Sequence, residues 1–297
     1  MLLGGAQLAV GAAAIFARFA LEGAGPLAVA ATRLAIAAFV LLAIAAVRYR
    51  LQGSRARPTR RQAATLAAAG VALAVHFGGW IASLEYTTVA ASTLLVATTP
   101  IWTALYDAIF RRQVLSRAAL VAFVTGGLGV SAIVGFNATP PPVGGHLLLG
   151  AALAVLGSVG MAVYLILVRD VRSSLGTRAV VTRTYAWAAI VLIAAAAIAR
   201  QSPPNLADGA AWGGIVAMAL ISQLLGHTAI NASLRWFSPS AVSFANLIEP
   251  IAAGLLALAI FGEALSPAAV AGGIVLLGSI AVVLREDRGS NVADESL

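Results

Sequence analysis

The chain has 297 residues, of which 61% are hydrophobic and only 10% are charged. A soluble domain is typically about 45–50% apolar and about 25% charged, so this composition excludes an ordinary soluble globular protein. All of the basic residues are arginine, and the chain contains neither lysine nor cysteine. That excludes disulfides, thiolate metal sites, cysteine nucleophiles and any cofactor held as a lysine Schiff base.

Long apolar runs fill most of the chain, separated by short polar gaps. A helix needs about 20 apolar residues to cross a bilayer, and the turn residues and charges in the gaps mark where each helix ends. The predicted spans are residues 3–21, 27–47, 63–84, 89–110, 117–136, 147–168, 179–199, 210–233, 240–260 and 268–284. We therefore expect an all-α polytopic membrane protein with ten transmembrane helices.

The formal net charge of +8 arises from arginines that lie mainly in the gaps, in groups within 48–61, 111–117 and 169–178. Cytoplasmic loops carry an excess of basic residues, whereas nucleic-acid-binding proteins gather them on one surface of a folded domain. We therefore expect the lipid bilayer as a partner and no nucleic acid. The same bias places both termini on the cytoplasmic side of an inner membrane.

The sequence repeats weakly when it is shifted by 150 residues. Ala82-Ser83-Leu84 then matches Ala232-Ser233-Leu234, and Pro100-Ile101 matches Pro250-Ile251. This predicts two five-helix repeats at residues 1–140 and 141–285, followed by a disordered cytoplasmic tail at 286–297. Because five is odd, the two repeats must cross the membrane in opposite senses, and such inverted repeats are typical of secondary transporters.

Several residues in this register also carry a family resemblance. They are Gly11, Phe16 and Arg18 in the first span, Pro26 with Arg33, Leu84 through Pro100, Leu234 through Pro250, and the corner Phe261-Gly262-Glu263-Ala264-Leu265-Ser266. The chain resembles the drug/metabolite transporter superfamily, the ten-helix group built from two EamA-type repeats. The first corner departs from the pattern because it has Gln113 where the second has Glu263.

The resemblance implies a carrier of a small-molecule substrate, commonly an exporter of amino acids, metabolites or drugs. It also implies a central cavity lined by the first, third, fourth, sixth, eighth and ninth spans, with the fifth and tenth peripheral. Among its branches, the amino-acid exporters are the one we favour. No cofactor is expected, and both a monomer and a homodimer fit the resemblance.

Polar residues within the apolar spans are the candidate cavity residues, since polar groups in hydrocarbon need a partner or water. Two stripes stand out, at i, i+4, i+8 in the eighth span and at i, i+3, i+6 in the ninth. The candidates are Gln7, Arg18, His76, Trp80, Thr99, Trp102, Met161, Tyr164, Gln223, His227, Asn231, Ser243, Asn246 and Glu249. The alternatives are hydrogen bonds between helices for the polar residues and anchoring at the membrane interface for the two tryptophans. Asp107 is expected to form a local ion pair with Arg111, four residues on.

Glu249 is the one carboxylate predicted near mid-membrane. Burial there disfavours its charged form, which makes it a candidate for proton coupling or for binding a substrate ammonium. Arg18 is a candidate partner for a substrate carboxylate, because guanidinium binds carboxylate in a bidentate way. An amino acid carries both groups. The alternative for Arg18 and Arg33 is pairing with Glu22 or extension toward the interface.

Pro100 and Pro250 are predicted to interrupt the fourth and ninth spans at equivalent positions. Proline lacks an amide hydrogen and crowds the carbonyl four residues back, at Val96 and Asn246. Those carbonyls must find another partner inside a membrane. The two prolines are therefore candidate hinges, and static kinks are the alternative.

The predicted function is secondary active transport of a small organic solute, most simply the export of amino acids by alternating access. Export of other metabolites or drugs is the alternative within the same class. A membrane-embedded enzyme is less favoured because no metal motif or nucleophilic constellation is present in the sequence. A passive channel is less favoured because of the two proline interruptions.

Overall fold

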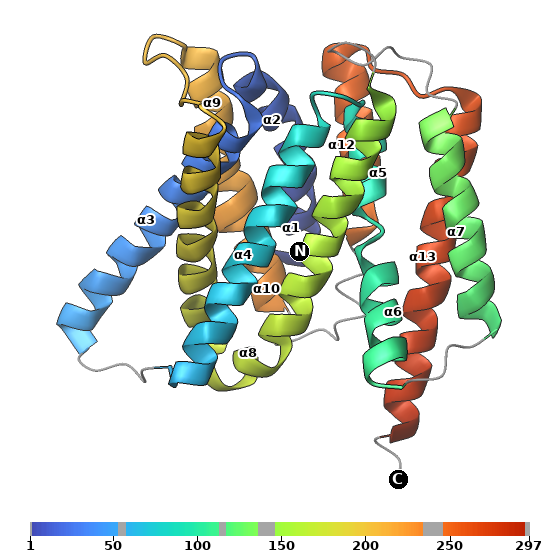
Figure 1. Ribbon diagram of the computed structural model, residues 1–297, viewed down its shortest axis with the longest axis horizontal. Coiled ribbons are helices and arrows are strands. Elements are labelled where there is room, and N and C mark those ends of the chain that lie inside the picture. The colour runs from blue at the N-terminus through green and yellow to red at the C-terminus, as the bar shows by residue number, and fades with distance from the viewer. Residues whose placement is uncertain (1, 53–57, 113–116, 136–145, 234–245, 295–297) are drawn as a thin grey trace.

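The computed structural model describes residues 2–52, 58–112, 117–135, 146–233 and 246–294 (Figure 1). In these residues all regular secondary structure is helical. The first half contains α1 (Leu2–Gly11), α2 (Ala13–Leu21), α3 (Pro26–Gln52), α4 (Arg60–Ser83), α5 (Val89–Val96), α6 (Thr99–Phe110) and α7 (Arg117–Gly135). The second half contains α8 (Leu147–Ile198), α9 (Gly209–Ala217), the π-helix η1 (Met218–His227), α10 (Thr228–Ser233), α12 (Ile248–Phe261) and α13 (Pro267–Asp294).

Apolar helices occur at every one of the ten predicted spans. Six described segments are long and apolar enough to cross a membrane: Pro26–Arg50, Arg60–Ser83, Val89–Phe110, Leu147–Arg169, Ser174–Ile198 and Gly209–Ser233. Four shorter apolar helices complete the set: Gly5–Leu21, Leu120–Ile133, Ile248–Phe261 and Pro267–Val282. The prediction of an all-helical polytopic membrane protein is confirmed.

Two of the predicted spans are two helices joined at a sharp bend, and both carry the label α8. α8 runs through both the sixth and the seventh span, and only Gly176 has non-helical angles, with φ +70° and ψ 156°. Glycine lacks a Cβ and adopts positive φ without strain. The chain therefore reverses direction at Gly176 with hardly any intervening loop.

Breaks in the helices lie directly before both prolines. The fourth span is divided into α5 and α6 at Ala97 and Thr98, and Pro100 occupies the first turn of α6. In the second half a turn at Leu247 precedes α12, so Pro250 lies in the first turn of that helix and not in its middle. Proline is well tolerated there, because the amide it lacks would have no partner in a first turn.

The C-terminal segment differs from the expected disordered tail. α13 continues to Asp294, ten residues beyond the predicted end of the last span at 284. Extending an existing helix costs far less than nucleating a new one, and this segment contains no proline.

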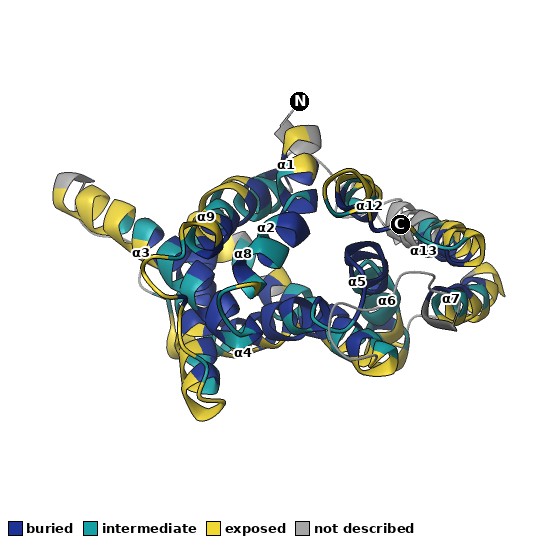
Figure 2. Ribbon diagram, turned by 90° about the horizontal axis from the view of Figure 1, so that it is seen from above, coloured by how far each residue is buried: buried dark blue, intermediate teal, exposed yellow. Residues whose placement is uncertain are grey.

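Apolar side chains are exposed on the outside of the bundle and several polar side chains are buried inside it, as expected for a helical bundle in lipid. Large apolar side chains face outward, with Phe39 72% and Phe110 71% exposed, whereas the polar side chains of Gln7, Arg33 and Gln223 are fully buried. Figure 2 shows the exposed residues on the outer faces of the helices. In lipid this arrangement is favourable because the outer surface does not meet water.

The arrangement of helices places the two ends of the bundle. The end of α3, the start of α4, the end of α6 and the bend in α8 lie at the bottom of Figure 1. We call this the arginine-rich end, after Arg60, Arg61, Arg111 and Arg172. The end of α2, the start of α5 and the α12–α13 corner lie at the opposite end. α7 and α13 pack on each other at one side of the bundle, as the resemblance implies for the fifth and tenth spans (Figure 2).

Candidate functional site

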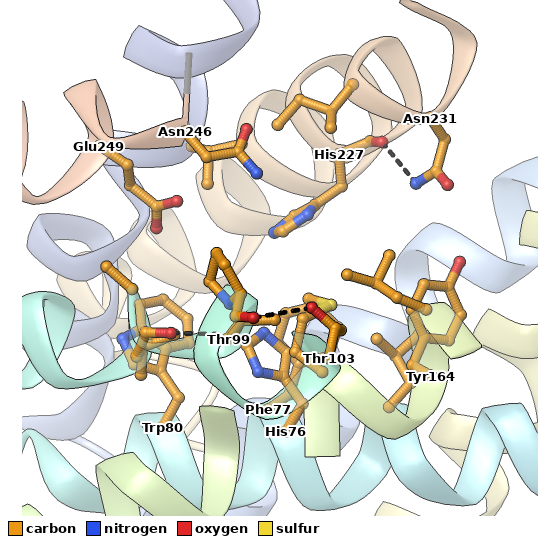
Figure 3. Close-up of a pocket in the computed structure, with 18 of the residues that line it drawn as sticks. His76, Phe77, Trp80, Thr99, Thr103, Tyr164, His227, Asn231, Asn246 and Glu249 are labelled. Atoms are coloured by element: carbon orange, nitrogen blue, oxygen red, sulfur yellow. Dashed lines mark hydrogen bonds between the residues drawn. The ribbon is translucent and has the colours of Figure 1, made fainter. Parts of the chain in front are cut away.

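A cavity of about 260 Å³ lies inside the bundle between the two halves. Its lining comes from the first, third, fourth, sixth, eighth and ninth spans, which is the set that the family resemblance implies. Two further lining residues lie elsewhere in α8: Arg172 just before the bend at Gly176, and Tyr185 after it. Figure 3 shows Glu249 and Asn246 on one side and His76, Phe77 and Trp80 on the other. The cavity therefore has polar groups facing an aromatic wall.

Most of the predicted site residues are brought together here. The lining contains His76, Trp80, Thr99, Pro100, Met161, Tyr164, Gln223, His227, Asn231, Asn246 and Glu249. The lining does not contain Gln7, Arg18, Trp102 or Pro250. Ser243 lies outside the described residues.

Glu249 and Thr99 occupy equivalent positions at the two helix breaks. They are 150 residues apart, and each directly precedes a proline. Thr99 Oγ1 donates a hydrogen bond to Val96 O at 2.9 Å, so the carbonyl that Pro100 frees has a side-chain partner. Glu249 directs its carboxylate toward the cavity (Figure 3). The two repeats thus present different chemistry at the same place, a hydroxyl in one half and a carboxylate in the other.

His76 and His227 lie on either side of Phe77. His76 Nδ1 lies 2.9 Å from Gly157 O, and because a carbonyl only accepts, Nδ1 carries the hydrogen. The rings of Phe77 and His227 meet edge-on with centroids 5.6 Å apart. Each histidine therefore has a packing contact with its neighbours. Both also line the cavity.

Close packing of α4 on α8 fixes this wall. A Cβ at Gly157 would lie 3.0 Å from His76 O and 3.1 Å from Trp80 N, so a larger residue would push the two helices apart. Glycine at such a crossing lets the backbones approach, as is usual in membrane helix pairs.

Gln7 supports the site without lining it. Its Nε2 donates to Asn246 Oδ1 at 2.6 Å, which ties α1 to the residue before the second helix break. The expected cavity role of Gln7 is therefore corrected to an interhelical hydrogen bond. Asn231 Nδ2 likewise donates to His227 O at 2.9 Å, within its own helical segment.

Arg18 does not face the cavity, which corrects the expectation that it awaits a substrate carboxylate. Its Nη1 lies 3.1 Å from Glu263 Oε1 and donates to Leu84 O at 3.3 Å. The guanidinium also stacks on Phe261, 5.6 Å from the ring centroid. Glu263 in turn accepts a hydrogen bond from Val89 N at 2.8 Å. The charge of Arg18 is thus already neutralised at the end opposite the arginine-rich end, by Glu263 and not by Glu22.

Trp102 is the third predicted cavity residue that has another role. Its Nε1 donates to Thr98 Oγ1 at 3.2 Å, one turn earlier on the same span. Thr98 Oγ1 also lies 2.9 Å from Ser158 Oγ. The indole therefore closes a hydrogen-bond chain between the fourth and sixth spans instead of facing the cavity.

Asp107 has a larger role than the sequence indicates. The expected ion pair with Arg111 is present at 3.4 Å. Arg169 also donates to both carboxylate oxygens of Asp107 at 3.3 Å, across the two halves of the chain. Asp107 and Arg169 both line the cavity, toward the arginine-rich end. No local spacing could have indicated this pair, because the partners are 62 residues apart.

Arg172 extends the lining at the same end. Burial lowers the pKa of its guanidinium, an effect that the nearby Tyr164 partly opposes. The cavity thus reaches a cluster of charges at the arginine-rich end, whereas the pair of Arg18 and Glu263 at the other end lies outside the lining.

Arg33, for which the sequence suggests pairing with Glu22 or extension toward the interface, lies directly behind the aromatic wall. It is fully buried, and its guanidinium lies 4.2 Å from the centroid of Phe77 and 5.6 Å from that of Trp80. Its Nη2 donates to Gln223 Oε1. It neither pairs with Glu22 nor extends to the interface.

The described part of the chain contains no cluster of three or more histidine, aspartate or glutamate side chains that could hold a metal ion.

Fold and site together define a multi-pass membrane protein in which two five-helix halves enclose a cavity lined by polar groups. The sequence pattern of the EamA-like transporter family matches residues 1–135 and 148–285, one match in each half. The chain belongs to the EamA-like transporter family, a family of membrane transporters of small solutes.

A solved crystal structure supports the same fold. It aligns with 95% of this chain and 94% of its own length, with a TM-score of 0.65 at 18% sequence identity. None of the curated proteins compared with this sequence matches it.

Proposed function

We propose that the protein is a secondary active transporter that exports amino acids or closely related solutes across the inner membrane by alternating access. The observation that carries this proposal is the cavity between the halves, with the Glu249 carboxylate opposite an aromatic wall. Secondary transporters with inverted repeats bind substrate at such an interface, often beside broken helices.

The chemistry and size of the cavity favour an amino acid. Glu249 offers an anionic partner for a substrate ammonium, and the amide of Asn246 and the imidazole of His227 lie beside it (Figure 3). The volume of about 260 Å³ is below the roughly 300–1,000 Å³ of typical pockets for drug-sized ligands. This favours a small metabolite over a bulky drug.

Two ion pairs support alternating access because they join the halves at opposite ends. Arg18 of the first half pairs with Glu263 of the second, and Arg169 of the second pairs with Asp107 of the first. Shifting Arg18 by the repeat offset of 150 gives residue 168, next to Arg169. Each half therefore contributes an arginine from its first span to a contact with the other half.

These pairs act as gates in the proposed cycle. In the conformation described here both pairs are formed, and the cavity lining reaches Asp107 and Arg169 but not Arg18 or Glu263. With the arginine-rich end in the cytoplasm, as the positive-inside bias indicates, breaking the Asp107–Arg169 pair opens the cavity to the cytoplasm for substrate uptake. Breaking the Arg18–Glu263 pair instead opens it to the outside for release.

A liposome counterflow assay tests the proposal. The full-length protein is reconstituted with one unlabelled amino acid inside, and uptake of the labelled compound is followed across a panel of amino acids, with and without a pH gradient. Saturable counterflow of at least one amino acid is expected. Absence of counterflow for the whole panel would overturn the amino-acid assignment, and unsaturable flux would indicate a channel.

The Glu249→Gln variant tests the central residue. It is expected to abolish transport or to remove its dependence on the pH gradient, because an amide neither carries the charge nor exchanges the proton. Glu85→Gln is the matched control, since Glu85 lies in the turn between α4 and α5, outside the cavity lining. Wild-type rates with unchanged pH dependence in Glu249→Gln would contradict the proposed role of this carboxylate.

A further inference from the structure

Arg33 is the most unusual buried group in the described part of the chain. It is among the largest fully buried side chains, and it is the eighth residue of the 27-residue helix α3. Two aromatic faces and an amide surround it, from Phe77, Trp80 and Gln223. Its Nη1 also lies 3.7 Å from the sulfur of Met218.

None of these partners carries a negative charge. The ion pairs among the described residues use Asp107 and Glu263, and neither pairs with Arg33. Burying a charge is costly unless an opposite charge compensates it. Cation–π contacts and one amide oxygen offset part of that cost, but they leave the net positive charge in place.

This charge lies one side chain away from the cavity. Phe77, Trp80 and Gln223 each contact Arg33, and each also lines the cavity. A charge in a poorly polarisable interior acts over several ångströms with little screening. A solute in the cavity therefore meets the field of Arg33 through its aromatic wall.

The field of Arg33 faces the charge of Glu249 across the cavity. Glu249 lies on the side opposite Phe77 and Trp80 (Figure 3). The cavity is thus electrically polarised, negative at the second helix break and positive behind the aromatic wall. A solute that carries both an ammonium and a carboxylate fits this polarity in one orientation only.

We infer that Arg33 is the specificity-determining residue that makes the cavity prefer a solute with a carboxylate, oriented toward Phe77 and Gln223 with its ammonium at Glu249. The inference rests on the proposed function and names the substrate class more narrowly, as zwitterionic α-amino acids over their amides and amines. Arg33 acts at a distance, and Gln223 holds it in place through its Oε1.

Three probes of similar shape test this inference: leucine, leucinamide and isoamylamine. Binding to the full-length purified protein is measured for each, and the ratio of the leucine affinity to the leucinamide affinity is the readout. Because only the carboxylate differs between these two probes, a general loss of packing lowers both affinities together and leaves the ratio unchanged.

The variants separate charge from structure. Arg33→Met removes the charge and is expected to lower the affinity ratio at least about fivefold. Arg33→Lys keeps the charge, so most of the wild-type affinity ratio is expected to remain. Arg183→Met is the matched control, because Arg183 is the repeat counterpart of Arg33 and binds Ala179 O in its own helix at 3.1 Å. Its ratio is expected to equal that of the wild type.

A second variant covers the case in which Arg33→Met does not fold. Gln223→Glu leaves Arg33 in place and neutralises it with a carboxylate of nearly the same shape, and the same loss of the ratio is expected. An unchanged ratio in a folded Arg33→Met or Gln223→Glu variant overturns the inference while the amino-acid proposal stands. A wild-type protein that binds none of the three probes overturns both.

Discussion

The Arg18–Glu263 pair permits a quantitative test of gating. The two charges are 3.1 Å apart, with side-chain exposures of 18% and 7%. At an effective dielectric constant of about 20 the attraction is about 5 kcal/mol. Desolvation offsets a large part of this, and a charge-assisted contact of this kind contributes about 2 kcal/mol net.

Glu263→Gln removes the ion pair and weakens the contact with Val89 N. If the pair holds this end closed, losing about 2 kcal/mol raises the population open at that end by about 30-fold, since 1.4 kcal/mol corresponds to tenfold. The effect is expected only at this end, because the Asp107–Arg169 contact is untouched.

The absence of native cysteine makes the assay direct. Thr93 lines the cavity and is 4% exposed, so a Thr93→Cys reporter is shielded while the Arg18–Glu263 end is closed. A membrane-impermeant maleimide is applied from the side opposite the arginine-rich end. Labelling is expected to accelerate by one to two orders of magnitude, about as the open population does, when Glu263→Gln is added.

Controls separate gating from misfolding. Glu85→Gln removes a carboxylate from the neighbouring turn and is expected to leave the labelling rate unchanged, and Arg18→Lys is expected to give an intermediate rate. Equal rates in the wild type and in a folded Glu263→Gln protein would refute the reasoning, because the pair would then not hold this end closed.

Three further outcomes are expected from the contacts described above. Arg169→Gln removes the bidentate contact to Asp107 and is expected to speed maleimide labelling of the Thr93→Cys reporter from the arginine-rich end, and slower labelling would contradict its gating role. Gly157→Ala places a methyl group 3.0 Å from backbone of α4 and is expected to cost about 1–3 kcal/mol, seen as a lower Tm in detergent, whereas Gly127→Ala, with nothing within 4 Å, is expected to leave the Tm unchanged. Burial raises the pKa of Glu85, so the folded protein binds this proton more tightly than the unfolded chain, and the stability that this group contributes is lost as the pH rises. Glu85→Gln is therefore expected to raise the Tm at about pH 7 and to raise it much less at about pH 4. An equal change in Tm at both pH values would exclude this cause.

Several features of the site follow from pattern alone. The stripe of Gln223, His227 and Asn231 lies on one side of the eighth span, and all three residues line the cavity. The breaks before Pro100 and Pro250 were also predictable, because proline cannot donate the helical hydrogen bond. These features depend on the spacing of residues within one helix, which can be taken directly from the sequence.

Arginine shows where such reasoning ends. Arg18 and Arg33 are both single arginines in apolar spans, and nothing in their neighbours along the chain distinguishes them. One pairs with Glu263 at an end of the bundle, and the other lies between Phe77 and Gln223 behind the cavity wall. Their partners are between 44 and 245 residues away, so packing alone decides between the two roles.

Composition and periodicity are sufficient to identify the lipid surroundings of this protein, its spans and its internal repeat, because they record what each helix faces. Which charges meet depends on how the helices pack, since an ion pair or a cavity wall requires side chains that different helices bring within a few ångströms. Asp107 makes the difference plain. Its pair with Arg111, four residues away, is predicted by helical spacing, whereas its pair with Arg169 depends on how the two repeats pack.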